Sequence, residues 1–285
     1  SSSRRTGCHL SVEAIAGDSR SDEQYTAVGY SVGRGPGDLD PEEAAADGTT
    51  RALRLLGATK PASAHVTVVL DRRVASTLLS IIGGTLSGED VMKGRSLFGG
   101  RLGEDVAVAG FTLFEDATDP HAYGASRFDA EGLACRRVPL IEAGRLTGYL
   151  YNTYGARMAG VASTASAVRG GYRTTPGTGA RALAIEPGEL DFDRILKQVG
   201  DGLYVQSISG VHSGVNPISG DFSVGAVGLF VKDGELAAPV REVTIASTIQ
   251  RMMQRIVAVG SDLEWPPGSA CGVSLAIGDI AMSGA

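Results

Sequence analysis

Apolar and polar residues alternate along several short segments of this chain, which is the pattern of half-buried β-strands. The segment 201–232 begins and ends with such alternation, and the residues between its two predicted strands are rich in Gly, Ser, Asn and Asp. A glycine-rich loop held by two strands can direct polar side chains at a ligand. The polar candidates in this loop are His212, Asn216, Asp221 and Ser223. A long connection made only of turns explains the same spacing equally well.

The same alternation predicts strands elsewhere. They are residues 7–16 and 24–33, which form a hairpin around a polar turn at 17–23, then 65–71, 106–114, 132–141 paired with 146–151, 182–186 and a closing strand from Cys271. Apolar positions spaced as on one helix face predict helices at 40–56, 74–87, 189–199 and 246–257. The sequence therefore predicts an α+β fold, rich in antiparallel strands and with flanking helices.

Composition then narrows the class of protein. Hydrophobic residues make up 43% and charged residues 20% of the 285 residues, and the net charge is −6. That balance argues against a broad nucleic-acid surface, while a local basic patch stays open. No apolar run is long enough to span a membrane, and the N-terminus has neither an initiator Met nor an apolar signal core. We expect a cytoplasmic protein, without nucleic-acid or membrane partners, whose chain begins inside a longer precursor.

The three cysteines are far apart and odd in number, which favours reduced thiols over a disulfide framework. They are Cys8, Cys135 and Cys271, and the sequence does not assign a role to any of them. Cys8 and His9 are adjacent on a predicted strand, so their side chains point to opposite faces and cannot easily pair. Cys271 is either a free core thiol or a thiol that faces a cleft, and the core is the favoured interpretation.

Common catalytic motifs are missing from the chain. The stretch 74–94 has no His, no Cys and no acidic residue before Glu89, so it lacks the ligands of a zinc-peptidase helix. The histidines, His9, His65, His121 and His212, fall in separate segments. No G-x-S-x-G elbow, Walker A loop or Rossmann glycine pattern is present.

Three arginines offer another kind of site. Arg169, Arg173 and Arg181 lie in a loop of small residues and could bind a carboxylate or a peptide terminus. Solvated loop charges are an equally good interpretation.

Blocks of sequence resemble a known family. GVNPISGDFSVGAVGLFVKDGEL, PVREVTIASTIQRMMQRIVAVGSDLEW and CGVSLAIGDIAMSG are similar to the C-terminal half of the TldD/PmbA proteins, and SVGRGPGDLDPEEA and VASTLLSIIGGTLSGEDV extend the likeness upstream. The resemblance covers nearly the whole chain and is strongest from Gly202 onward. It implies that residues 1–60, a hairpin plus a helix, are a remnant of the family's N-terminal domain and that residues 61–285 form its C-terminal domain. Most of that N-terminal domain would precede Ser1.

The family pairs two related subunits, and only the TldD type carries a zinc motif, H-E-x-x-x-H, on a helix. Here Ser80 and Thr85 stand at the histidine positions and Ile81 at the glutamate position. Ser and Thr are poor zinc ligands and Ile cannot act as a base. The resemblance therefore implies a TldE-type subunit with no catalytic, cofactor-binding or metal-binding residues of its own. Zinc is expected in a TldD-type partner, with which this chain would form a heterodimer.

The resemblance leaves the substrate open. The complex would cleave unfolded peptides or process peptide-derived precursors. One alternative is a metal-dependent amide hydrolase or deacetylase that acts on a natural-product intermediate. Another is a regulatory or binding module without chemistry, since the family was also discussed as a modulator of DNA gyrase.

Overall fold

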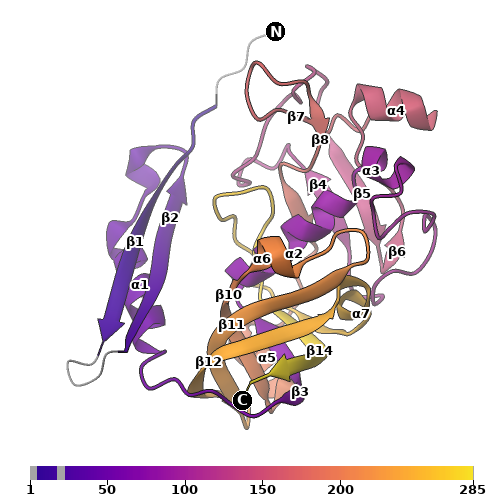
Figure 1. Ribbon diagram of the computed structural model, residues 1–285. Helices are drawn as coiled ribbons and strands as arrows, with labels where there is room; N and C mark the ends of the chain where they lie inside the picture. Colours follow the sequence, from indigo (N-terminus) through magenta and orange to yellow (C-terminus); the bar gives the residue numbers. More distant parts are fainter. Residues whose placement is uncertain (1–4, 18–22, 285) are drawn as a thin grey trace.

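A computed structural model describes residues 5–17 and 23–284 of the chain (Figure 1). The N-terminal elements are strands β1 (Cys8–Gly17) and β2 (Gln24–Gly33), the 3-10 helix η1 (Pro36–Asp38) and helix α1 (Pro41–Leu53). β1 and β2 form the predicted antiparallel hairpin. Residues 18–22, most of its predicted turn, lie outside the described residues.

Helix α1 packs against one face of the hairpin because Gly29 leaves room for it. A Cβ atom at Gly29 would lie 1.8 Å from the carbonyl oxygen of Ala44 in α1. The carboxylate of Asp40 accepts a hydrogen bond from the backbone N of Glu43 at 2.9 Å and caps the helix, as its position in the sequence predicts. The helix ends earlier than the predicted residue 56.

The largest sheet has the strand order β12–β11–β10–β3–β14–β13. Its strands are β3 (Ala64–Leu70), β10 (Gly202–Ser209), β11 (Asp221–Lys232), β12 (Glu235–Thr248), β13 (Ile256–Val259) and β14 (Leu275–Ser283). Neighbouring strands are antiparallel except β10 and β3, which run parallel. Because β12 also pairs with β14, the sheet curls back on itself.

A central helix, α2 (Arg72–Thr85), lies between this sheet and a second one (Figure 1). The second sheet has the order β6–β5–β4–β9, with β4 (Leu113–Asp116), β5 (Arg137–Glu142), β6 (Arg145–Leu146) and β9 (Leu183–Ile185). Leu78, Leu79 and Ile82 of α2 join the main core together with Leu203 and Leu113, one from each sheet. A small ribbon is formed by β7 (Ala167–Val168) and β8 (Gly177–Thr178). The predicted α+β class is confirmed.

The remaining helices are short. They are α3 (Gly88–Met92), α4 (Thr153–Ala159), α5 (Phe192–Val199), α6 (Val211–Gly214) and α7 (Ile249–Gln254). The predicted helices 189–199 and 246–257 were too long, because Asp191 and Thr248 are extended residues that cap α5 and α7. Among the described residues, no helix combines the length and the apolarity needed to cross a lipid bilayer.

Several strand predictions were wrong in their extent. Of the predicted strand 146–151 only Leu146 lies in a strand, β6, and the closing strand β14 begins at Leu275 and not at Cys271. In the predicted strand 106–114, only the last two residues belong to β4, because the chain before them makes turns such as the hydrogen bond from the Phe111 N to the Val108 O at 2.9 Å. The predicted strand 132–141 joins the sheet as β5 only from Arg137, because the Asp129 carboxylate holds the preceding residues in a turn by accepting the Leu133 N at 2.9 Å.

Candidate functional site

Helix α2 carries the three positions that the resemblance assigns to a zinc motif. Ser80 is exposed and Ile81 is partly buried, whereas Thr85 is 2% exposed. The Thr85 hydroxyl donates a hydrogen bond to the Ile82 carbonyl at 2.7 Å.

These residues do not fit a zinc ion. A hydroxyl already bonded to its own helix and an aliphatic side chain offer neither the thiolate, imidazole nor carboxylate that zinc requires. Within residues 5–17 and 23–284, no group of three or more His, Cys, Asp or Glu side chains is arranged to hold a metal. That the chain carries no zinc stays a prediction for metal analysis.

The glycine-rich loop is shorter than predicted, because β11 already begins at Asp221. The Asn216 side-chain oxygen accepts the backbone N of Ile218 at 2.9 Å, and the Ser219 hydroxyl donates to the Asp221 carboxylate at 2.6 Å. Both polar candidates are thus engaged in forming their own turn. His212 on α6 and Ser223 on β11 are exposed. A role of these two in binding a ligand stays a prediction.

A short segment after α3 connects this loop to the end of α2. The Ser96 hydroxyl donates to the Thr85 carbonyl, and the Leu97 N donates to the Pro217 carbonyl at 3.2 Å. The loop and the motif positions are therefore neighbours, although they are more than a hundred residues apart in sequence.

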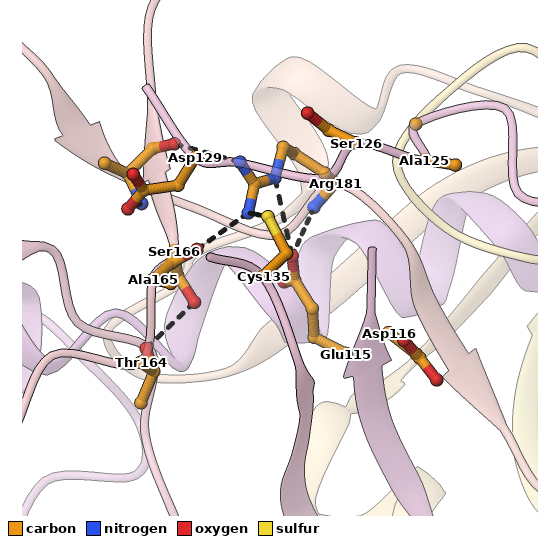
Figure 2. Close-up of polar contacts among 12 residues, drawn as sticks. Glu115, Asp116, Ala125, Ser126, Asp129, Cys135, Thr164, Ala165, Ser166 and Arg181 are labelled. Atoms are coloured by element: carbon orange, nitrogen blue, oxygen red, sulfur yellow. Dashed lines mark hydrogen bonds and ion pairs between the residues drawn. The ribbon is translucent and has the colours of Figure 1, made fainter. Parts of the chain in front are cut away.

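Sequence reasoning missed a buried carboxylate on β4 (Figure 2). Glu115 is 2% exposed. Its Oε1 accepts the Arg181 backbone N at 3.1 Å and lies 3.8 Å from the Arg181 Nε, while none of the described residues offers its Oε2 a hydrogen bond. Burial raises the pKa of Glu115 to about 7, against the opposing charge of Arg181. This carboxyl group is poised to exchange a proton near neutral pH.

Arg181 connects the surroundings of Glu115. Its guanidinium donates to the Ala165 carbonyl at 2.7 Å and to the Cys135 Sγ at 3.3 Å (Figure 2). It also donates to the Phe128 carbonyl at 3.5 Å. Burial raises the pKa of the Cys135 thiol although Arg181 opposes the shift. Arg181 therefore holds neighbouring segments together. Its side chain is not free to bind the carboxylate of a ligand, as its position in the loop had suggested.

The other residues singled out in the sequence are dispersed. Arg169 and Arg173 are exposed, as solvated loop charges would be. Cys271 is fully buried in the main core, and burial raises the pKa of its thiol to about 11, so the core interpretation is confirmed. Cys8 is partly buried and His9 exposed, which confirms that they face opposite sides of β1.

Comparison with known proteins identifies the family. The model of the PmbA/TldA metallopeptidase C-terminal domain matches residues 63–284. The chain belongs to the PmbA/TldD family. Its sequence is 32% identical to the metalloprotease PmbA of Escherichia coli O157:H7 over 244 residues, which are 85% of this chain and 52% of that protein. The chain thus spans about half the length of this PmbA relative.

Solved structures agree with this PmbA/TldD assignment. A putative modulator of a DNA gyrase from Thermotoga maritima is 28% identical, with a TM-score of 0.90 over 97% of this chain and 62% of that chain. TldE from Thermococcus kodakarensis has the same TM-score over 98% of this chain and 63% of that chain, and at 21% identity it shows the fold alone. The division of this chain at residue 60 stays a prediction.

Proposed function

We propose that this chain is a non-catalytic TldE-type subunit, which joins a TldD-type partner and helps to enclose the zinc peptidase site of that partner. The proposal depends on the residues that occupy the zinc-motif positions of helix α2. Ser80, Ile81 and Thr85 replace two histidines and a glutamate, and the Thr85 hydroxyl is already bonded to Ile82. A family member that keeps this helix without its ligands has no means of holding zinc there.

The bond-breaking chemistry would then belong to the partner, and this chain would contribute walls and binding groups. The names of its relatives support a peptide or peptide-derived substrate, because the PmbA of Escherichia coli is called a metalloprotease. The metal-dependent hydrolysis of a small-molecule amide requires the same architecture, so substrates of both kinds belong in the test.

The test compares this chain, a TldD-type chain and the co-expressed pair. We expect native mass spectrometry to find a one-to-one heterodimer and metal analysis to find zinc in the partner only. Hydrolysis of an unfolded polypeptide, or of an N-acylated small molecule, should require both chains. Stoichiometric zinc in this chain alone, together with unaided amide hydrolysis, would contradict the proposal.

Variants on α2 sharpen the test. Ser80→Ala removes an exposed hydroxyl, and Thr85→Val keeps the shape of a buried side chain while it removes the hydroxyl. Because neither residue holds a metal in the proposal, both variant pairs should hydrolyse the substrate within about twofold of the unmodified pair. A loss of all activity in Ser80→Ala, with the heterodimer intact, would show that this position takes part in the chemistry.

A further inference from the structure

A cavity of about 760 Å³ lies where the N-terminal residues meet the segment after β4. Three arginines line it: Arg5, Arg34 and Arg127. Its lining also includes the polar Thr118 and Ser126 and the ring of Phe128, and none of the described lining residues is acidic. A cavity of this size holds a ligand as large as a short peptide or an acylated amino acid.

The three arginines differ in how many of their N–H hydrogen-bond donors are free to bind a ligand. Arg34 uses both terminal nitrogens on backbone carbonyls, among them those of Thr6 and Tyr123 at 3.3 Å each, so it is a fixed positive charge. Within residues 5–17 and 23–284, Arg5 uses only its Nη1 for hydrogen bonds, to the carbonyls of Gly124 and Ala125. The exposed Arg127 side chain has no hydrogen-bond or ion-pair partner among the described residues. Arg5 and Arg127 therefore have donors available for a ligand.

The two described carboxylates that bond to lining residues, those of Asp116 and Asp38, do not themselves line the cavity. The Asp116 carboxylate accepts the backbone N of Thr118 at 3.0 Å and also its hydroxyl. The Asp38 carboxylate accepts the backbone N of Arg34 at 2.9 Å and lines a neighbouring cavity of about 570 Å³. Arg181 lies behind the wall and bonds the Phe128 carbonyl, with Glu115 as its acidic neighbour. The cavity therefore has a positive wall beside an apolar ring.

We propose that this cavity binds the carboxylate of a short peptide or an acylated amino acid, with Arg5 and Arg127 as the hydrogen-bond donors. An arginine can bind a carboxylate through two parallel hydrogen bonds, and the charge of Arg34 adds a favourable potential. Phe128 provides a surface for the apolar part of the ligand. That the ligand is a peptide or acylated amino acid rests on the proposed function, whereas carboxylate binding rests on the cavity alone.

Calorimetric titration of this chain alone tests the proposal, so a failure to pair with a TldD-type chain would not affect it. The probe is an N-acetylated tetrapeptide with a free C-terminal carboxylate, compared with the same peptide as its C-terminal amide. A hydrogen-bonded charge pair is worth more than tenfold in affinity, so we expect the amide to bind at least about tenfold more weakly. Added salt should weaken the binding of the acid more than that of the amide.

Variants locate the site. Arg127→Gln and Arg5→Gln should each weaken binding of the acid by about tenfold and bring it close to the amide. Arg157→Gln is the matched control, because Arg157 is exposed on α4 outside the cavity, and it should bind the acid normally. Inorganic phosphate is the second probe and should compete with the acid for the same arginines. Equal binding of acid and amide, binding of phosphate alone, or unchanged binding in both arginine variants would overturn the proposal.

Discussion

Two buried carboxylates of this chain each lie beside an arginine, yet their pKa values shift in opposite directions. Asp71 accepts hydrogen bonds from the Arg51 Nη1 at 2.8 Å, the Tyr204 hydroxyl at 2.6 Å and the Arg73 backbone N at 3.0 Å. Burial alone would raise its pKa, but Arg51 and these hydrogen bonds outweigh burial and hold the pKa of Asp71 below its usual range. Asp71 is therefore a permanent anion that ties α1 to the start of α2.

Glu115 has the same kind of partner and fewer hydrogen bonds. One of its oxygens has no donor among the described residues, and the Arg181 Nε stays 3.8 Å from the other oxygen. Burial therefore dominates, and the pKa of Glu115 rises to about 7. The presence of an arginine therefore does not by itself determine the charge of a buried carboxylate, and we expect the number of its hydrogen-bond donors to decide it.

The largest effect is expected where the fully bonded pair is broken. Arg51→Met should lower the free energy of unfolding by about 3–5 kcal/mol, because it leaves the Asp71 charge buried without its cation. Urea titration followed by circular dichroism measures the loss. Arg54→Met, at the exposed end of the same helix, is the control and should change stability by less than about 0.5 kcal/mol. Equal losses in the two variants would show that the Arg51–Asp71 pair adds nothing specific.

A second experiment uses the pH dependence of stability to distinguish the Glu115–Arg181 pair from the Asp71–Arg51 pair. The folded chain holds the Glu115 proton up to a pH of about 7, whereas the unfolded chain releases it near 4.5, so stability falls as the pH rises through that window. The loss should be on the order of 3 kcal/mol. Asp71 has a lowered pKa, so its contribution is complete above its unfolded pKa of 3.8 and is lost only as the pH falls through the folded value.

Glu115→Gln isolates this pH dependence. The variant cannot titrate, so its stability relative to the unmodified chain should increase between pH 5 and pH 8 by on the order of 3 kcal/mol. Urea unfolding of both proteins at the two pH values measures the difference. If the two proteins lose stability in parallel over this range, Glu115 does not titrate there and its second oxygen has a partner.

Local signals in the sequence predicted much of the fold. The cap at Asp40 and the alternation of 24–33 each act between near neighbours, and the elements they predict are present. The boundary at Thr248 was missed because a β-branched residue that ends a strand can equally open a helix. The parallel pairing of β10 with β3 depends on distant residues and has no local signal.

The difference between local and distant signals also explains which residues of the candidate site could be predicted. The replaced motif residues on α2 could be recognised from the sequence because the motif lies within one short segment. Glu115 could not be recognised in this way, since its partner Arg181 is 66 residues away. The only local signal is its two-residue spacing from the apolar Leu113, which places both on the same face of β4. The cavity of the three arginines unites residues 5, 34 and 127, which no spacing rule connects.

The smallest expected effect tests the donor count at Asp71 directly. Tyr204→Phe removes one hydrogen bond to the buried carboxylate and should lower the free energy of unfolding by about 1.5–3 kcal/mol. Tyr149→Phe is the matched control, because the Tyr149 hydroxyl donates to a neutral acceptor, the Phe98 carbonyl, at 2.8 Å, and its loss should cost about 0.5–1.5 kcal/mol. Both are measured by urea unfolding at pH 7. A cost for Tyr204→Phe no larger than that for Tyr149→Phe would mean that Arg51 and the backbone already satisfy Asp71, and the difference between the two carboxylates would then reside in the arginine geometry.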